Sequence, residues 1–508
     1  MSASRPTEQT PPPERPARKA LGDSAITVVE RIVAQASQFA VFIFAARMLS
    51  PAEFGVFALA SACAILLLRA AEAAWAPYIM SWSGDAERPR QVLYLAILCG
   101  IAVAFVGQLG GLAASALADH PMIGQLTHLF SFWVMLATVS SAQKGVMIWQ
   151  QNMKASAICE ILSEIAGLIT AITTLLLGYG IFALVFGRLA AQTVHLLASF
   201  MVTRLSPISG MPLAELIELW TFSKQIFTSR MIANLRLYTA TFVIGAFLGP
   251  VAVGLFRAAD RLVIAFSELL MVPGYLMAWT QFRKARDAGP PETAPERVRQ
   301  MAALFFKVLF AASLPLMAWL VFMADDIIRG LLSDEWAAAT PLVAILAISR
   351  LLFMPSVATE PLLSITDQAK RLPVVTMFIF AFSLSVTIVA AQFGLYAVAW
   401  SQIFIASGVL VINLMVFQRF ANVRWSDVLG GLPGLAVPLA LGVVTLWALT
   451  QWSASAEIHE LLRAVGFGLA ALVVYIAGLR VFNPSFLDLI WRAGGPVVKP
   501  STSALKAS

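Results

Sequence analysis

Ionisable side chains recur inside long apolar runs of this 508-residue sequence, and these are the residues best placed to do chemistry. A charge in apolar surroundings is costly unless it is paired or meets a ligand. Arginine presents a planar fork that matches phosphate oxygens, so the arginines could bind a phosphorylated anion. The basic candidates are Arg31, Arg69, Arg230, Arg236, Arg257, Arg261 and Arg350, and their candidate charge partners are Glu30, Glu72, Asp260 and Glu268.

The first group of charges belongs to one predicted helix hairpin. Arg69 and Glu72 are three residues apart and therefore share a helix face. Counted from the intervening turn at the rise of a helix, Glu30 and Arg31 lie at the same depth as this pair. We therefore expect Glu30 or Arg31 to contact Arg69 or Glu72 in at least one state of the protein.

The second group lies in the predicted hairpin of residues 222–248 and 251–279, where arginines outnumber carboxylates. Arg257 and Arg261 are four residues apart and share a face, and Arg236 reaches a depth similar to that of Asp260. Such an excess would be expensive in a sealed interior, but it suits a wet cavity that receives an anion. The alternative, that these charges are structural salt bridges between neighbouring helices, stays open.

Fourteen apolar stretches of about 20 residues would position these side chains as membrane-spanning helices. Apolar residues make up 59% of the chain and charged residues only 12%, about half the share of a soluble domain. The sequence therefore predicts an all-α polytopic membrane protein. The expected spans are residues 26–48, 54–80, 92–117, 123–148, 156–177, 181–203, 222–248, 251–279, 301–323, 337–358, 373–391, 394–417, 433–451 and 463–482.

Lysine and arginine are concentrated in every second connection between these spans. The connection 280–300 carries five basic residues, whereas the connection 325–336 carries four acidic ones. Because basic connections remain in the cytoplasm, this pattern predicts that both termini are cytoplasmic. It also accounts for the net charge of +7, which need not indicate a nucleic-acid partner. The remaining excess could hold anionic lipid headgroups.

An internal repeat relates two turns that are 199 residues apart. The segment Leu49–Phe57 aligns with Leu248–Phe256, and matching residues continue into the following helix. The pattern predicts two parallel, pseudo-symmetric six-helix lobes, an architecture suited to alternating access, followed by two C-terminal helices. The expected parts are a disordered cytoplasmic tail 1–21, an N-lobe 22–204, a cytoplasmic linker 205–220, a C-lobe 221–419, two final helices 420–482 and a cytoplasmic tail 483–508.

No motif for a cofactor, a metal or a nucleotide is found. Cys63, Cys99 and Cys159 lie far apart in apolar runs, without the spacing of metal ligands or of a disulfide framework. A phosphate loop and a dinucleotide fingerprint are also missing. We therefore expect no cofactor and no intrinsic ATP-driven pump.

The segment Arg47–Ala60, with the sequence RMLSPAEFGVFALA, resembles the first hairpin of the polysaccharide transport proteins, or O-antigen flippases. These belong to the multidrug/oligosaccharidyl-lipid/polysaccharide (MOP) exporter superfamily. The resemblance implies a flippase of the bacterial inner membrane that carries an undecaprenyl-pyrophosphate-linked oligosaccharide to the periplasmic leaflet. It also implies membrane lipids as partners, and it leaves a partnership with the polysaccharide polymerase open. By this resemblance, the cavity-facing basic positions are Arg31, Arg69, Arg230, Arg236, Arg257 and Arg261.

Three other functions compete with this one. A multidrug efflux antiporter of the same superfamily should have an acidic or aromatic cavity, whereas this one is net basic. A lipid II flippase would share the two C-terminal helices. A membrane glycosyltransferase, polymerase or ligase would need a large outer loop, but residues 324–336 and 452–462 are too few for a catalytic domain. His459 beside Glu460 is more typical of a solvated turn.

Overall fold

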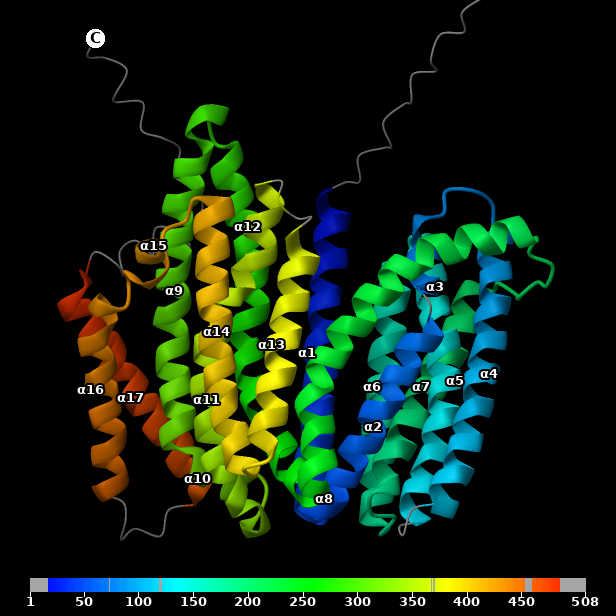
Figure 1. Ribbon diagram of the computed structural model, residues 1–508, viewed down its shortest axis with the longest axis horizontal. Coiled ribbons are helices and arrows are strands. Elements are labelled where there is room, and N and C mark those ends of the chain that lie inside the picture. Colours follow the sequence, from blue (N-terminus) through cyan, green and yellow to red (C-terminus); the bar gives the residue numbers. More distant parts are fainter. Residues whose placement is uncertain are drawn as a thin grey trace, which may run out of the picture. The chain divides into compact units, whose positions relative to one another are not determined.

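The computed structural model describes residues 17–72, 74–117, 121–366, 368, 371–452 and 459–484. Within these residues every regular element is a helix (Figure 1). The elements up to the centre of the chain are α1 (Ala17–Met48), α2 (Pro51–Glu72), α3 (Trp75–Ser81), α4 (Glu87–Leu117), α5 (Pro121–Trp149), α6 (Met153–Leu176), α7 (Phe182–Thr203) and α8 (Leu213–Asp287). The later helices are α9 (Ala294–Phe322), α10 (Ala324–Leu331), α11 (Thr340–Phe353), α12 (Thr359–Ile365), α13 (Leu372–Ala391), α14 (Leu395–Ala421), α15 (Trp425–Leu429), α16 (Pro433–Trp452) and α17 (Glu460–Phe482). Short 3-10 turns are η1 (Pro291–Thr293), η2 (Asp334–Ala339) and η3 (Met354–Ala358).

The predicted fourteen spans are confirmed. Thirteen helical stretches of the described residues are long and apolar enough to cross a membrane. The longest of them, Leu213–Asp287, has 75 residues and is broken at Gly249, where φ is +81°. Glycine adopts this conformation without strain, and Pro250 follows it, so the stretch contains two spans. The chain is a multi-pass, all-helical membrane protein.

Contacts divide the chain into two compact units. Unit 1 comprises residues 1–42 and 64–228, and unit 2 comprises residues 43–63 and 229–508. The expected boundaries at 22–204 and 221–419 stay predictions, but two observations bear on them. Residues 43–63, expected in the first lobe, group with the second unit. The helices also run further than expected, because α1 begins at Ala17 and α8 begins inside the expected linker 205–220.

Unit 1 is built around α4, α5, α6 and α7, which lie side by side (Figure 1). Its core packs the short helix α3 against α4, α5 and the start of α8, with Ile79, Leu93 and Val146 almost fully buried. Arg88 on α4 pairs with Glu215 on α8 at 2.5 Å, so the first turn of α8 is tied to this core.

Unit 2 contains α9, α11, α13 and α14, with the hairpin α16–α17 packed on α9. Two hydrogen bonds attach α17 to α9: Trp319 Nε1 donates to the carbonyl oxygen of Ala464 at 2.8 Å, and the Tyr475 hydroxyl donates to that of Ala311 at 2.9 Å. The two C-terminal helices beyond the twelve-helix repeat are therefore an integral part of this unit.

The turn between α1 and α2 also belongs to unit 2. The Ser50 amide donates to the Glu53 carboxylate at 2.9 Å and the Glu53 amide donates to Ser50 Oγ at 3.4 Å, which together form a capping box that starts α2. Arg47 donates to the carbonyl oxygens of Gly330 and Leu331 at the end of α10. The first hairpin is thus attached to the connection between α9 and α11.

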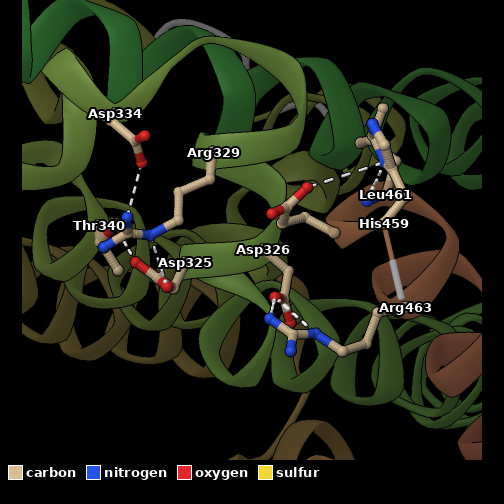
Figure 2. A network of polar contacts seen from close by, with 9 residues as sticks. Asp325, Asp326, Arg329, Asp334, Thr340, His459, Leu461 and Arg463 are labelled. Carbon is tan, nitrogen blue, oxygen red and sulfur yellow. Dashed lines mark hydrogen bonds and ion pairs between the residues drawn. The ribbon is translucent and has the colours of Figure 1, made fainter. Parts of the chain in front are cut away.

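This connection carries a network of charges around α10 (Figure 2). Arg329 contacts Asp325 at 2.9 Å and Asp334 at 2.6 Å, and its hydrogen bond with Asp325 raises the pKa of the Arg329 guanidinium. Arg463 at the start of α17 reaches the buried Asp326, with Nε at 2.8 Å from Oδ1. The network therefore links α10 to α17.

The exposed His459 precedes α17 and caps it, as a solvated turn would. Its Nδ1 accepts a hydrogen bond from the Leu461 amide at 3.3 Å, and its side chain is 60% exposed.

Candidate functional site

The intramembrane charges gather in two groups, one in each unit. The cationic group of unit 2 comprises Arg257 and Asp260 on α8 and Arg350 on α11. The polar cluster of unit 1 comprises Glu30 on α1, Lys144 on α5, Glu160 on α6 and His195 on α7. All of these residues lie within helices that are long and apolar enough to span a membrane.

Asp260 is the centre of the cationic group. Arg257 lies one turn before Asp260 on α8, and its Nη1 is 3.1 Å from Asp260 Oδ2. Arg350 Nη2, from the last turn of α11, is 3.9 Å from the other oxygen, Oδ1. One carboxylate therefore faces two guanidinium groups, and a net positive charge remains.

Both arginines are only partly covered. The Arg257 side chain is 24% exposed and the Arg350 side chain is 26% exposed. The guanidinium of Arg257 also lies over the Tyr238 ring, with Cζ 5.6 Å from the centroid. An aromatic face stabilises a cation without neutralising it, so Arg257 keeps a charge that an anion can meet.

The other predicted basic residues of α8 are Arg230, Arg236 and Arg261. Arg236 is half-buried and Arg230 is exposed, and neither makes an ion pair within the described residues. Arg261 interacts electrostatically with Glu268 two turns further along the same helix. Arg236, which lies at a depth similar to that of Asp260, does not pair with it in the described part of the chain, because Arg257 and Arg350 contact that carboxylate instead.

In unit 1, the contact predicted between Glu30 or Arg31 and Arg69 or Glu72 is not found among the described residues of this structure, so it stays a prediction for another state. Arg69 and Glu72 do pair, with Nη1 2.6 Å from Oε2. Glu30 does not contact them in the described residues, because it faces Lys144 at 3.6 Å. The geometric reason is that α1 presents Glu30 to α5 rather than to α2. Arg31, next to Glu30, is exposed.

The polar cluster of unit 1 contains residues that sequence analysis missed. Lys144 Nζ lies 2.8 Å from Glu160 Oε2, and His195 Nε2 lies 3.4 Å from the same oxygen. Ser140 forms a short hydrogen bond with His195 Nδ1. Lys144 and His195 could have been noticed as polar residues inside the predicted spans 123–148 and 181–203. Their partners could not have been, because these depend on which helices are neighbours.

The described residues contain no group of three or more metal-ligating side chains. Cys63, Cys99 and Cys159 are free thiols. What the cationic group and the polar cluster can do chemically is therefore to bind charged species.

An apolar cavity of about 450 Å³ lies within unit 2, between α8, α9, α16 and α17. Its walls include Phe266, Leu316, Trp319, Val443 and Leu472. One wall of this cavity is formed by α8, the helix that carries Arg257 and Asp260.

The comparisons with known proteins agree with this architecture. The family profile described as "Polysaccharide biosynthesis protein" matches residues 44–341, which is more than half of the chain. The chain belongs to this family. A curated relative, the succinoglycan biosynthesis transport protein ExoT of Rhizobium meliloti (strain 1021), is 23% identical over 315 residues. That match covers 61% of this chain and only 62% of the relative.

Two solved structures show the fold. The lipid II flippase MurJ, in an inward closed conformation, superposes with a TM-score of 0.70 at 12% identity, covering 92% of this chain and all of that one. An inward-facing multidrug resistance MATE family transporter of the MOP superfamily gives a TM-score of 0.57 at 12% identity, covering 77% and 94% of the two chains. The protein is thus a multi-pass membrane member of a polysaccharide biosynthesis family with the fold of MOP superfamily transporters.

Proposed function

We propose that this protein is a flippase that moves an undecaprenyl-pyrophosphate-linked oligosaccharide from the cytoplasmic to the periplasmic leaflet of the bacterial inner membrane. Its family serves polysaccharide biosynthesis, and the relative ExoT is named for succinoglycan transport. The fold is shared with a lipid II flippase. A lipid-linked glycan needs a protein that accepts a charged phosphate and a long apolar chain together, and does so without forming or breaking a bond.

The observation that carries the proposal is the imbalance of charge around Asp260. This carboxylate neutralises only one of the two guanidinium groups that face it, Arg257 and Arg350. A half-buried Arg236 adds further positive charge on α8. Arginine forks bind the oxygens of a pyrophosphate with paired hydrogen bonds, and in apolar surroundings this attraction is weakly screened.

The apolar cavity of unit 2 suits the other end of such a substrate. With about 450 Å³ between four membrane-spanning helices, it has room for part of an isoprenoid chain. Because the isoprenoid chain stays within the membrane, we expect this lining to guide it beside α8.

The positive charge disfavours binding of organic cations, and therefore disfavours a multidrug efflux antiporter, although a multidrug resistance MATE family transporter shares the fold. A lipid II flippase stays as the nearest alternative, because lipid II carries the same pyrophosphate carrier with a different glycan. In keeping with the basic connections, we place both termini in the cytoplasm. A polysaccharide polymerase is a candidate partner on the periplasmic side.

The test is flipping of a fluorescent isoprenyl-pyrophosphate disaccharide in proteoliposomes that contain the full chain. We expect the double variant Arg257→Ala, Arg350→Ala to flip at least about tenfold more slowly, a change of about 1.4 kcal/mol. The lysine versions should recover only part of the rate, because lysine keeps the charge but loses the fork. Arg329→Ala, on the exposed part of α10, is the matched control.

Thermal unfolding of each variant in detergent separates loss of function from loss of folding. An unchanged rate in a folded double variant would contradict the assignment. Transport of a cationic dye, with no flipping of the glycolipid, would favour a multidrug exporter instead.

A further inference from the structure

The polar cluster of unit 1 has no role in holding the pyrophosphate, and its charges do not balance. The ionisable groups that face one another from α1, α5, α6 and α7 are Glu30, Lys144, Glu160, Glu164, Arg188 and His195. Three are carboxylates and two are permanent cations. With a neutral histidine the cluster therefore has a net charge of −1 inside a membrane-spanning unit, and a single proton on His195 makes it neutral.

We propose that His195 is a binding site for one exchangeable proton, and that this proton drives the transporter by changing how Lys144 is shared between Glu160 and Glu30. The binding site stands on the geometry of unit 1 alone. Its role as the driving site rests on the proposed flippase function.

The surroundings of His195 suit both protonation states. Its side chain is 6% exposed, so its hydrogen bonds must be made within the protein. In the neutral state, Nδ1–H donates to the Ser140 hydroxyl, while Nε2 makes no hydrogen bond within the described residues and lies 3.4 Å from Glu160 Oε2. After protonation, Nε2–H faces the Glu160 carboxylate, and Nδ1–H keeps the hydroxyls of Ser140 and Ser199 as acceptors, with Ser199 Oγ 3.3 Å away.

Glu160 provides the path by which a proton reaches His195. It lies between His195 and Lys144, and its side chain is 27% exposed against 6% for the imidazole. A proton that arrives from water meets this carboxylate first and passes to Nε2 of the ring behind it, the nitrogen that carries no hydrogen in the neutral state. The transfer needs no other reactant, because a neutral imidazole and a proton give an imidazolium.

Lys144 connects the proton to α1. While His195 is neutral, Lys144 is shared between Glu160 at 2.8 Å and Glu30 at 3.6 Å. Once His195 is positive, it neutralises Glu160 itself, and Lys144 becomes available to Glu30. The attraction between α5 and α1 then increases. Helix α1 continues from unit 1 into unit 2 and carries the exposed Arg31 beside Glu30. The proton therefore changes the contacts of a helix that contributes residues to both units.

The binding site is tested by NMR of the full chain in lipid nanodiscs with isotope-labelled histidine. The chain has four histidines, and the variant His195→Gln identifies the signal of interest. We expect this signal to change reversibly when the pH of the sample is changed, because the ring takes up and releases a proton. Its midpoint should move by about one pH unit or more in Lys144→Met, because a neighbouring charge is removed. His128→Gln is the control, since His128 contacts Gln108 instead of this cluster.

A signal that does not titrate, or an identical midpoint in Lys144→Met, would overturn the proton site. A response to sodium at constant pH would assign the site to a metal cation and would also overturn it.

Coupling is tested in proteoliposomes with an imposed pH gradient. The wild type should flip glycolipid faster with the gradient than without it, whereas His195→Gln should keep only the gradient-independent rate. Equal stimulation of both proteins would refute the driving role. If the wild type flips no glycolipid under any condition, the proposed function fails while the histidine titration still decides the proton site.

Discussion

Gly55 and Gly254 pack reciprocally, each against the start of the other's helix. A Cβ atom added to Gly55 would lie far closer than 3.0 Å to the carbonyl oxygen of Pro250, and one added to Gly254 would lie equally close to that of Pro51. Because these residues correspond in the internal repeat, the contact has approximate twofold symmetry. Both turns belong to unit 2, so the repeat brings its own two copies together.

This contact predicts that side chains at the two glycines are poorly tolerated. Gly55→Ala and Gly254→Ala should each destabilise the protein by about 1–3 kcal/mol, because the obstructing atoms are backbone and cannot rotate away. Thermal unfolding in detergent measures the effect. Gly466→Ala on α17 is the matched control, since a Cβ there meets no atom within 4 Å.

The double variant provides a sharper test of the reciprocal geometry. Each alanine pushes the same two helices apart, so the second should cost less than the first. Strictly additive losses would mean that the two glycines act at independent contacts.

The positions of the spans could be predicted because apolar length alone decides which segments cross a membrane. The break at Gly249 could also be predicted, since Leu248-Gly249-Pro250 cannot continue a regular helix. Arg257 and Asp260 pair as neighbours on one helix, which spacing predicts. The sequence makes Arg350 a candidate binding residue, but its contact with Asp260 depends on the packing of α11 beside α8.

The partner of Glu30 shows where sequence reasoning fails. Depth along a hairpin suggested α2, yet rotation of α1 about its own axis turns Glu30 toward Lys144 on α5. A repeat reveals that helices are related, but it contains no information on which faces meet. Single polar residues such as His195 gain meaning only when a neighbouring helix supplies a carboxylate.

The pair of Arg463 and Asp326 should be important for stability. Asp326 has a side chain only 7% exposed, and Arg463→Ala would leave its charge buried without a partner. Loss of one member of a buried pair costs about 3–5 kcal/mol. Thermal unfolding should show this loss, and adding Asp326→Asn should restore part of it. Arg329→Ala, an exposed arginine of the same network, should change little.

The orientation of the chain can be checked in a variant without Cys63, Cys99 and Cys159. Single cysteines at Thr293 and Glu335, both exposed, report on the basic and the acidic connections. An impermeant thiol reagent applied to whole cells should label Glu335→Cys and spare Thr293→Cys, because basic connections stay in the cytoplasm. Inverted vesicles should give the opposite labelling. If both cysteines are labelled from the same side, residues 293 and 335 do not lie on opposite sides of the membrane, and the predicted topology is wrong.

Asp260→Asn should change stability and substrate affinity in opposite directions. Removal of this carboxylate leaves Arg257 and Arg350 facing each other without a counter-charge, so the folded protein should lose stability. The same removal increases the positive charge offered to an anion, so a pyrophosphate should bind about tenfold more tightly, or by about 1.4 kcal/mol.

Titration of tryptophan fluorescence with a short isoprenyl pyrophosphate measures affinity, and thermal unfolding measures stability. Addition of the ligand should raise the unfolding temperature of Asp260→Asn more than that of the wild type, because binding to the folded state stabilises it in proportion to affinity. If stability and pyrophosphate affinity both fall in Asp260→Asn, the role of Asp260 is to support the fold. The pyrophosphate must then be held elsewhere than at Arg257 and Arg350.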